Sequence, residues 1–528
     1  MDPSRLKTIE NIRRNVAAGE FNRKAEPGDP QLDAEQLDTL LRANVGSRKR
    51  LPYRLRNFAA RVIAGVFSRI YNRGTRFEGL EKIRSIKGPA IITSNHFDFL
   101  DCTVMHELGR RAWHRHIIGL SQATNFAMGG FLGFILKYYD MIPVFKQKEF
   151  MAEVFEPLMD EAVRDGRFIL IYPEQEMWWH YRKPRPPKRG AYLYAAKYGV
   201  PLIPCFTEMT ELSSIDRFGV RRLRYTVHIG DPVYPDPALS ERENSFAMMQ
   251  ADYAFKKAAY ERAYGRPLDY SFGGFDIAGV QYYSSFDCDM VGGTAQDCAL
   301  PEDYEWIAEG AQARRRYRRC YRLYRAASQL YRLFSGVRLR NREVFDAVPK
   351  GGGAFIFSNH TLTLGDALTP PLSPLSRRHW IVCSPANFAV PLIGRKFGWM
   401  GALPTTGRLS DVRKLSKAIS RRYAEGGFLT IYPEAHLWPY CSFIRPFSDT
   451  SFSFPAELMA PCFSATTVFT RRRPGSRPRI TIYFDGPFWP DADLPPRKRR
   501  EELARRVREA MEGRSALSDC SYIDYLPL

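Results

Sequence analysis

The chain has 528 residues, a hydrophobic content of 45% and a formal net charge of +21 at pH 7. This length favours two domains with packed cores, and the charge favours an anionic partner such as a phosphorylated compound, an acidic lipid surface or a nucleic acid. The nine cysteines are scattered and form no C-x-x-C pair, which argues against a disulfide scaffold or a zinc site and for a reducing compartment.

The first predicted element is a basic amphipathic helix at 48–71. Residues 1–50 are highly charged and contain no apolar h-region, so we expect no secretory signal and a charged N-terminal segment over 1–45. Two interpretations of the helix stay open. It either packs on its own domain with its basic face in solvent, or lies on an anionic membrane surface. The apolar residues that repeat along it at helical spacing are Leu55, Phe58, Val62 and Val66.

Short apolar strands separated by helical stretches follow. The predicted strands are at 90–93, 167–172 and 202–206, with counterparts at 354–357, 428–432 and 462–468. Strands that alternate with helices predict an α/β fold with a mostly parallel sheet in each domain. The second domain is also preceded by a basic helix, at 314–334, which carries its aromatic residues on one stripe. A charged surface helix is predicted at 495–514.

The window 117–136 contains no charged residue and is long enough to span a bilayer. It also contains four glycines and several polar side chains, among them Gln122 and Asn125. A buried strand, a loop and a short apolar helix therefore explain it better than a transmembrane span.

An internal repeat defines the domains. Ser94-Asn95-His96 recurs as Ser358-Asn359-His360, and Tyr172-Pro173-Glu174 recurs as Tyr432-Pro433-Glu434. In both copies a Trp follows the Glu by 4 residues, an Arg-Pro by 11 and a Pro by 27. Matching at so many positions predicts two homologous domains. The first domain is expected at 46–268 and the second at 305–528. The linker between them is expected at 269–304.

The repeated histidines are the best catalytic candidates. His96 is followed by Asp101 in an H-x4-D pattern, which is a weak signal when it stands alone. If His96 lies on a loop and Asp101 in the first helical turn after it, the carboxylate holds one ring nitrogen while the other nitrogen removes a proton from a hydroxyl. The second copy pairs His360 with Asp366 and has one extra residue, so its geometry depends on whether the loop absorbs that insertion.

These motifs resemble those of the glycerolphosphate and lysophosphatidic acid acyltransferases, the PlsC-like superfamily. The family's N-H-x4-D block matches 95–101, and its Gly-rich block with a basic end matches 142–146. The start of its F-P-E-G-T-R block matches 172–174, and its V-P-I-x-P block matches 200–204. The resemblance covers 61–206 well and 333–470 less well.

The resemblance implies catalytic roles for His96, Asp101, His360 and Asp366, and substrate-binding roles for Lys146, Glu174, Arg185, Arg408, Glu434 and Arg445. The chain departs from the family at Gly-Thr-Arg of the third block, whose place is taken by residues 175–177 in the first copy and 435–437 in the second. The phosphate-binding Arg of that block is therefore absent from both copies. We expect Arg182 and Arg185, or Arg445, to supply the missing charge, unless these cations are merely solvated. The tryptophans after each Glu, Trp178, Trp179 and Trp438, are expected in the core or at a lipid interface.

The resemblance further implies acyl transfer from acyl-CoA or acyl-carrier protein to a lysophospholipid such as 1-acylglycerol 3-phosphate. It implies no bound cofactor or metal, and a cytoplasmic protein attached peripherally to an anionic membrane. Two alternatives stay open: one active domain beside a lipid-binding or regulatory copy, and a non-enzymatic membrane-binding protein. Nucleic acid is not expected as a partner, because the sequence has no zinc-finger, KH or RNP pattern.

Overall fold

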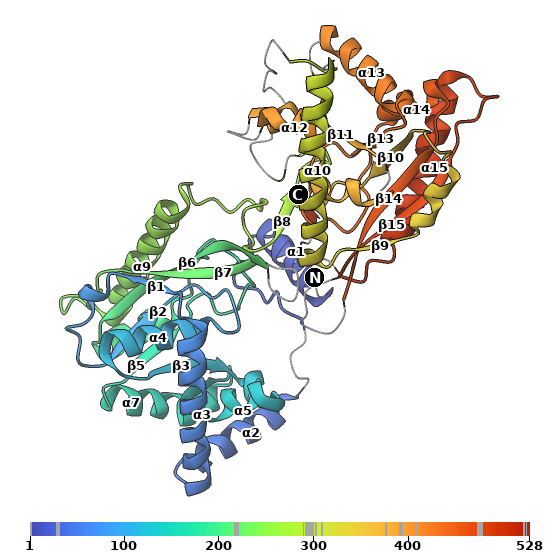
Figure 1. Cartoon of the computed structure of the whole chain (residues 1–528). Coiled ribbons are helices and arrows are strands. Elements are labelled where there is room, and N and C mark those ends of the chain that lie inside the picture. Colours follow the sequence, from blue (N-terminus) through green and yellow to red (C-terminus); the bar gives the residue numbers. More distant parts are fainter. Residues whose placement is uncertain are drawn as a thin grey trace. The chain divides into compact units, whose positions relative to one another are not determined.

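The computed structural model describes residues 3–27, 32–215, 221–288, 290, 300, 304–307, 310–374, 377–389, 394–406, 409–471, 479–520, 523 and 525–528. The chain divides into two compact units (Figure 1). Met1–Ser214 and Arg221–Val280 form the first unit, and the second consists chiefly of Gln281–Leu528. Each unit is built on its own seven-stranded sheet.

The sheet of the first unit has the strand order β1-β7-β6-β2-β5-β3-β4. Its strands are β1 Arg76–Glu78, β2 Ala90–Thr93, β3 Ile117–Gln122, β4 Met141–Val144, β5 Phe168–Ile171, β6 Leu202–Ile215 and β7 Arg221–Ile229. The central strand β2 pairs in parallel with β5 on one side and with β6 on the other. The predicted strands of this domain are therefore present, and the prediction of an α/β fold with a mostly parallel sheet is confirmed.

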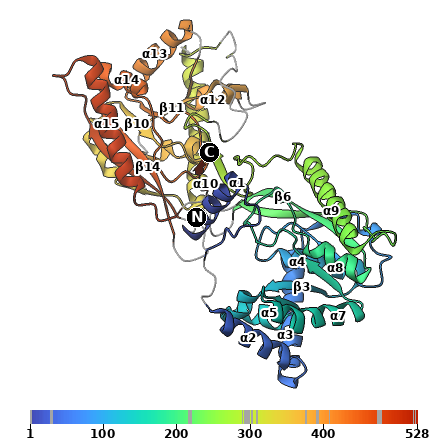
Figure 2. The ribbon, with the colours of Figure 1, turned by 180° about the vertical axis from the view of Figure 1, so that it is seen from behind.

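Helices cover both faces of this sheet, because both faces are apolar. Along β2, Ile91 packs with one group of buried residues and Ile92 with another on the opposite face. Helix α8 lies beside α9, and α3 contacts α4 and α5 (Figure 2). The helices are α1 Pro3–Ala17, α2 Ala34–Ser47, α3 Leu51–Tyr71, α4 Asp101–Trp113, α5 Gly130–Tyr138, α6 Lys148–Phe150, α7 Glu156–Arg164, α8 Gly190–Tyr198 and α9 Glu241–Tyr264, with short η1 Leu80–Lys82, η2 Ala123–Ala127 and η3 Met151–Phe155.

The second unit repeats this arrangement. Its sheet order, β9-β15-β14-β10-β13-β11-β12, matches that of the first unit strand for strand, and β14 and β15 form an antiparallel pair. The strands are β9 Arg338–Arg340, β10 Ala354–Ser358, β11 His379–Cys383, β12 Ala402–Pro404, β13 Phe428–Ile431, β14 Cys462–Thr470 and β15 Arg479–Phe488. The predicted duplication is thus confirmed by two sheets of the same order.

The helices of the second unit again lie around its sheet. They are α10 Gly310–Ser335, α11 Gly365–Leu368, α12 Gly394–Met400, α13 Leu409–Ala424, α14 Ser453–Leu458 and α15 Pro496–Ser515, with short η4 Arg342–Ala347, η5 Pro370–Leu372, η6 Pro385–Ala389 and η7 Asp449–Phe452. Strands β8 Gln281–Tyr283 and β16 Tyr525–Pro527 form a separate small sheet. Helix α15 confirms the helix predicted near the C-terminus, and it buries one side, including Leu503 and Val507, against the core.

The uncharged window 117–136 is not a single helix. It contains β3, η2 and most of α5, as the strand, loop and short helix interpretation predicted. Within the described ranges, no helix is long and apolar enough to cross a membrane. The start of the segment expected to be a linker is packed instead: Asp276, Ile277 and Ala278 are buried in the first unit.

Candidate active site

The loop that follows β2 carries His96. Parallel strands end at the same edge of a sheet, so residues after β2, β5 and β6 meet there. The Asn95 side chain fastens this loop to β6: its Nδ2 donates to the Thr207 carbonyl (3.1 Å), and its Oδ1 accepts from the Thr207 N–H (2.7 Å). Asn359 bridges to Thr467 in the same way in the second unit. The Asn of each Ser-Asn-His triplet therefore fixes the loop that presents the histidine.

His96 and Asp101 form a dyad in the first unit. His96 lies on the loop and Asp101 is the first residue of α4, which is the arrangement that the spacing required. The His96 Nδ1 and Asp101 Oδ2 are 2.7 Å apart, and the same oxygen accepts from the Phe97 N–H at 2.9 Å. Among the described residues, none bonds to His96 Nε2, and this side chain is 21% exposed. Nε2 is therefore available to a substrate hydroxyl.

The second unit forms an equivalent dyad despite its extra residue. His360 Nδ1 and Asp366 Oδ2 are 2.7 Å apart, and this Oδ2 accepts from the Leu362 N–H at 2.9 Å. The loop thus accommodates the insertion without a change in the His–Asp distance, and its Leu364 is 69% exposed. Burial raises the pKa of the Asp366 carboxyl above its ordinary value, although its hydrogen bond to His360 acts to lower it.

A tyrosine lies under each histidine. The Tyr172 ring stacks on the His96 ring with centroids 4.1 Å apart, and its hydroxyl donates to Asp101 Oδ1 at 2.7 Å. Tyr432 stacks on His360 at 4.5 Å, but its hydroxyl donates to the Asp366 main-chain carbonyl. The sequence alone did not indicate a role for these tyrosines. The repeated Tyr-Pro-Glu, where the related family has Phe-Pro-Glu, was the available signal.

A buried ion pair supports the His96 loop from inside. The Glu174 Oε2 accepts from the His96 N–H at 3.2 Å and pairs with the Arg185 guanidinium at 2.8 Å. Arg185 also donates to the Glu176 carbonyl and lies over the Trp178 ring, 4.5 Å from its centroid. Burial lowers the pKa of Arg185, although the charge of Glu174 opposes the shift.

This placement corrects the prediction that Glu174, Arg185, Glu434 and Arg445 bind substrate. The Arg185 and Arg445 side chains are both 0% exposed, and each pairs with the glutamate 11 residues before it. A guanidinium whose hydrogen bonds are directed to the protein interior is not available to a phosphate. The four residues form two internal clamps, and the fixed Glu–Arg spacing in both repeats was the sequence signal for them.

The remaining predicted cations have different positions. Lys146 is exposed two residues beyond the end of β4, at the edge of the sheet where the carboxyl ends of the strands meet. It therefore stays a candidate for phosphate contact. Arg408 lies outside the described residues.

The tryptophans that follow each Glu belong to the core. Trp178 and Trp438 are 0% exposed and Trp179 is 2% exposed, so the core interpretation is confirmed and the interpretation as lipid-interface anchors is wrong for these residues. The main-chain N–H groups of Trp178 and Trp438 donate to the histidine loops: Trp178 N to the His96 carbonyl and Trp438 N to the His360 carbonyl, both at 3.1 Å.

The position after each Glu has a left-handed backbone, with φ of 66° at Gln175 and 61° at Ala435. The third family block has Gly at this place, and glycine adopts positive φ without a steric cost. Both units therefore form the same left-handed turn here, although the residue in it is Gln175 or Ala435 and not glycine.

An outer strap, residues 21–23, covers the clamp of the first unit. Arg185 Nη1 donates to the Phe21 carbonyl (2.8 Å), Asn22 Nδ2 donates to the Pro186 carbonyl (3.0 Å), and the Trp178 indole donates to the Arg23 carbonyl (2.8 Å). The charged N-terminal segment is therefore packed against the site. Sequence reasoning missed this contact, which depends mainly on backbone carbonyls.

Part of the chain is similar to known proteins. Residues 74–208, which lie in the first unit, match the family model described as Acyltransferase. The solved structure of the 1-acyl-sn-glycerophosphate (LPA) acyltransferase PlsC from Thermotoga maritima also matches, with 16% identity, a TM-score of 0.30, and coverage of 50% of this chain and 98% of that chain. No curated protein matches the sequence.

Proposed function

We propose that the first unit is an O-acyltransferase. It moves a fatty acyl group from acyl-CoA or acyl-carrier protein to the hydroxyl of a lysophospholipid such as 1-acylglycerol 3-phosphate, in phospholipid biosynthesis or remodelling. One observation carries the proposal: within the segment that matches the acyltransferase family model, His96 has Nδ1 fixed by Asp101 at 2.7 Å, while its side chain is 21% exposed and no described residue bonds to Nε2. A histidine held in this way is suited to act as a general base.

The reaction follows from this geometry. His96 Nε2 takes the proton of the acceptor hydroxyl, and Asp101 stabilises the imidazolium that forms. The acceptor oxygen bonds to the thioester carbonyl carbon, the carbon–sulfur bond breaks, and the thiolate takes the proton from His96. The products are an ester and a free thiol, and no acyl-enzyme is needed. Glu174 and Arg185 hold the loop, and Lys146 is proposed to contact the acceptor phosphate.

Helix α3 supports the proposal of peripheral attachment to an anionic membrane. Its buried residues are Tyr53, Ala60 and Ser68, whereas its large apolar side chains point outward. Phe58 and Ile70 are 68% and 69% exposed. The further exposed apolar residues of the helix are Leu51, Leu55, Val62, Ile63, Val66, Phe67 and Tyr71. An apolar face of this kind with arginines along it suits a helix lying in a lipid interface.

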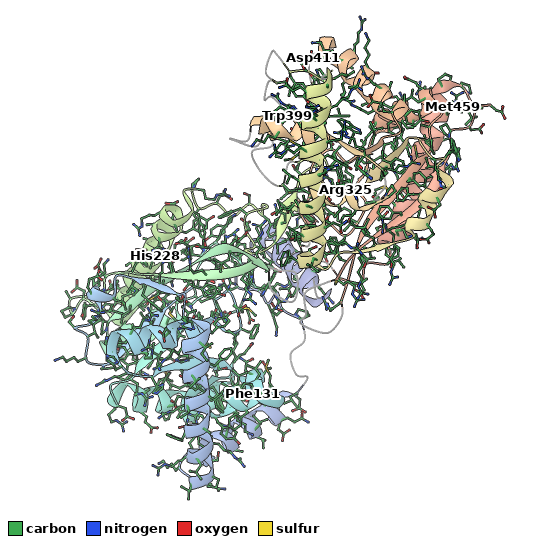
Figure 3. The ribbon with its side chains drawn as sticks, viewed as in Figure 1. Phe131, His228, Arg325, Trp399, Asp411 and Met459 are labelled. Carbon is green, nitrogen blue, oxygen red and sulfur yellow. The ribbon has the colours of Figure 1, made fainter. Side chains whose placement is uncertain are left out.

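Other exposed apolar side chains lie on or next to elements that contact α3. Phe131 of α5, which contacts α3, is 67% exposed and is labelled in Figure 3. Phe99, three residues after His96, is 53% exposed. A membrane surface bound there would present an amphipathic acceptor close to the dyad, which is why we propose lipid rather than a soluble alcohol as the substrate class.

The test is acyl transfer in the full chain, read by mass spectrometry with palmitoyl-CoA and a panel of lysophospholipids that includes lysophosphatidic acid. The His360→Ala protein isolates the first unit, and adding His96→Ala to it should lower the rate at least about 100-fold. His116→Ala is the matched control, because His116 is exposed and precedes β3 at the opposite end of the sheet. Equal rates for His360→Ala and the double variant would refute the proposal.

A further inference from the structure

The second unit lies outside the segment that matches the acyltransferase family model, which ends at residue 208. Its strand order and its dyad nevertheless equal those of the first unit. The His–Asp distance is 2.7 Å in both, and the histidine side chains are 21% and 23% exposed. Among the described residues, none bonds to His360 Nε2, so the proton-accepting nitrogen is as available as that of His96.

The second unit has the same buried glutamate–arginine pair behind its histidine loop. The Glu434 Oε2 accepts from the His360 N–H at 2.9 Å and from Arg445 Nη2 at 3.0 Å. Both charged side chains are almost fully buried. Burying such a pair is costly unless its hydrogen bonds are used, and an apolar pair of similar volume is often as stable. Here the pair holds the His360 loop, as its counterpart holds the His96 loop.

The outer strap is repeated as well. In the second unit the Trp438 indole donates to the Cys288 carbonyl at 2.9 Å, and Phe286 packs on the Trp438 ring. Phe286–Cys288 therefore corresponds to Phe21–Arg23, whose last carbonyl receives the Trp178 indole. The dyad, the ring under the histidine, the clamp and the strap are thus all present in the second unit.

The insertion does not displace these parts. The extra residue is accommodated between Leu362, which packs inward, and the exposed Leu364. The Leu362 N–H still bonds the aspartate oxygen that holds the histidine, as the Phe97 N–H does in the first unit. A displacement of about 1 Å in a catalytic group can cost about 100-fold in rate, so the equal distances argue for retained chemistry.

We propose that the second unit is a second acyl-transfer centre, in which His360 is the base and Asp366 holds it. The inference rests on the proposed function, because it assigns the same reaction to the second site. His360 Nε2 takes the proton of a lipid hydroxyl, the hydroxyl oxygen bonds to the carbonyl carbon of an acyl thioester, the carbon–sulfur bond breaks, and the thiolate leaves with the proton. The chain then carries two centres rather than one enzyme and one binding copy.

Four full-length proteins test the proposal: wild type, His96→Ala, His360→Ala and the double variant, with palmitoyl-CoA and the lysophospholipid panel. We expect His96→Ala to keep product formation that falls at least about 100-fold when His360→Ala is added. Equal background rates in His96→Ala and the double variant, with every acceptor, would overturn the second centre. The first centre is judged separately, from His360→Ala against the double variant. A wild type that forms no product would overturn both.

A second substitution guards against a folding defect. Asp366→Asn in the His96→Ala protein keeps the side-chain volume but removes the charge that supports an imidazolium, so a strong loss of rate is expected. Thermal unfolding of each variant is measured alongside. If Asp366→Asn keeps the His96→Ala rate while the protein is folded, His360 is not acting as a base held by Asp366, and the proposal fails.

Discussion

At the residue scale, the two dyads differ in how the aspartate is held. The Asp101 carboxylate accepts from the His96 ring and two main-chain N–H groups, and also from the Tyr172 hydroxyl at 2.7 Å. The pKa of Tyr172 lies well above 10, because its ring is removed from water beside a carboxylate. The Tyr172 hydroxyl therefore stays protonated over the ordinary assay pH range and keeps donating its hydrogen bond to Asp101.

Tyr172→Phe removes this hydroxyl and keeps the ring under His96. A hydrogen bond to a charged group is worth about 1.5–3 kcal/mol, so we expect the rate of the first unit to fall by about 10-fold or more. The hydroxyl of Tyr172 stays protonated below pH 10. The ratio of the rate with Tyr172 to the rate with Tyr172→Phe should therefore be constant from about pH 6 to pH 9. The measurement is the acyl-transfer rate in the His360→Ala background.

Tyr432→Phe, in the His96→Ala background, is the matched comparison. The Tyr432 hydroxyl donates to a main-chain carbonyl and not to the Asp366 carboxylate, so a smaller effect on the second unit is expected. An equal loss in both units would show that the hydroxyl–carboxylate bond is not what matters, and that Tyr172 acts through its stacked ring.

The sequence allowed the two His–Asp contacts to be predicted, because a His and an Asp near each other in the chain leave few geometries to consider. It did not allow the role of Arg185 and Arg445 to be predicted. A guanidinium beside prolines in a polar stretch has the same local pattern whether it faces solvent or pairs with a buried carboxylate. Only the packing of Trp178 and Trp438 above these arginines decides between the two.

At the element scale, the two basic helices show why amphipathic spacing does not identify the buried face. The tyrosine stripe of α10 faces its own domain, with Tyr317 and Tyr321 buried. In α3 the apolar stripe faces outward, and the residues that pack inward are smaller or polar. The packing interpretation therefore holds for Tyr317 and Tyr321 of the α10 stripe, whereas Phe334 at its end is 84% exposed. The outward face of α3 suits the lipid-surface interpretation.

We expect the triple variant Leu55→Gln, Phe58→Gln and Val62→Gln to weaken binding to vesicles that contain phosphatidylglycerol. Burying an apolar side chain of this size is worth about 1.5–3 kcal/mol when complete, so partial insertion of three predicts a loss of at least about 10-fold. Tyr234→Gln with Leu239→Gln is the control, because both are exposed apolar residues outside α3. Vesicle sedimentation gives the binding constant, and unchanged binding by the triple variant would refute a lipid-facing α3.

At the scale of the whole molecule, the repeat was evident in the sequence because the motifs recur at fixed spacing. The division between the units was harder to predict. A stretch rich in Gly, Ser and Asp at 269–298 suggested a linker, yet residues 276–280 are packed in the first unit and 281–283 form a strand of the second. Composition reports the flexibility of a free chain, and it does not report contacts made by backbone groups.

This division predicts which fragment of the second unit is stable. A fragment 281–528 keeps β8 paired with β16, the Tyr283 and Phe286 rings on Trp438, and the Cys288 carbonyl on its indole. A fragment 305–528, which follows the boundary suggested by the sequence, loses all of these contacts. Two aromatic contacts and one hydrogen bond are together worth about 3 kcal/mol, so its Tm should be lower by about 5–10 °C. Thermal unfolding of the two fragments by circular dichroism measures the difference.

Phe286→Ala in the longer fragment should lower the Tm by part of that amount, since it removes one of the rings. Equal Tm values for the two fragments would mean that the strap adds no stability to the second unit.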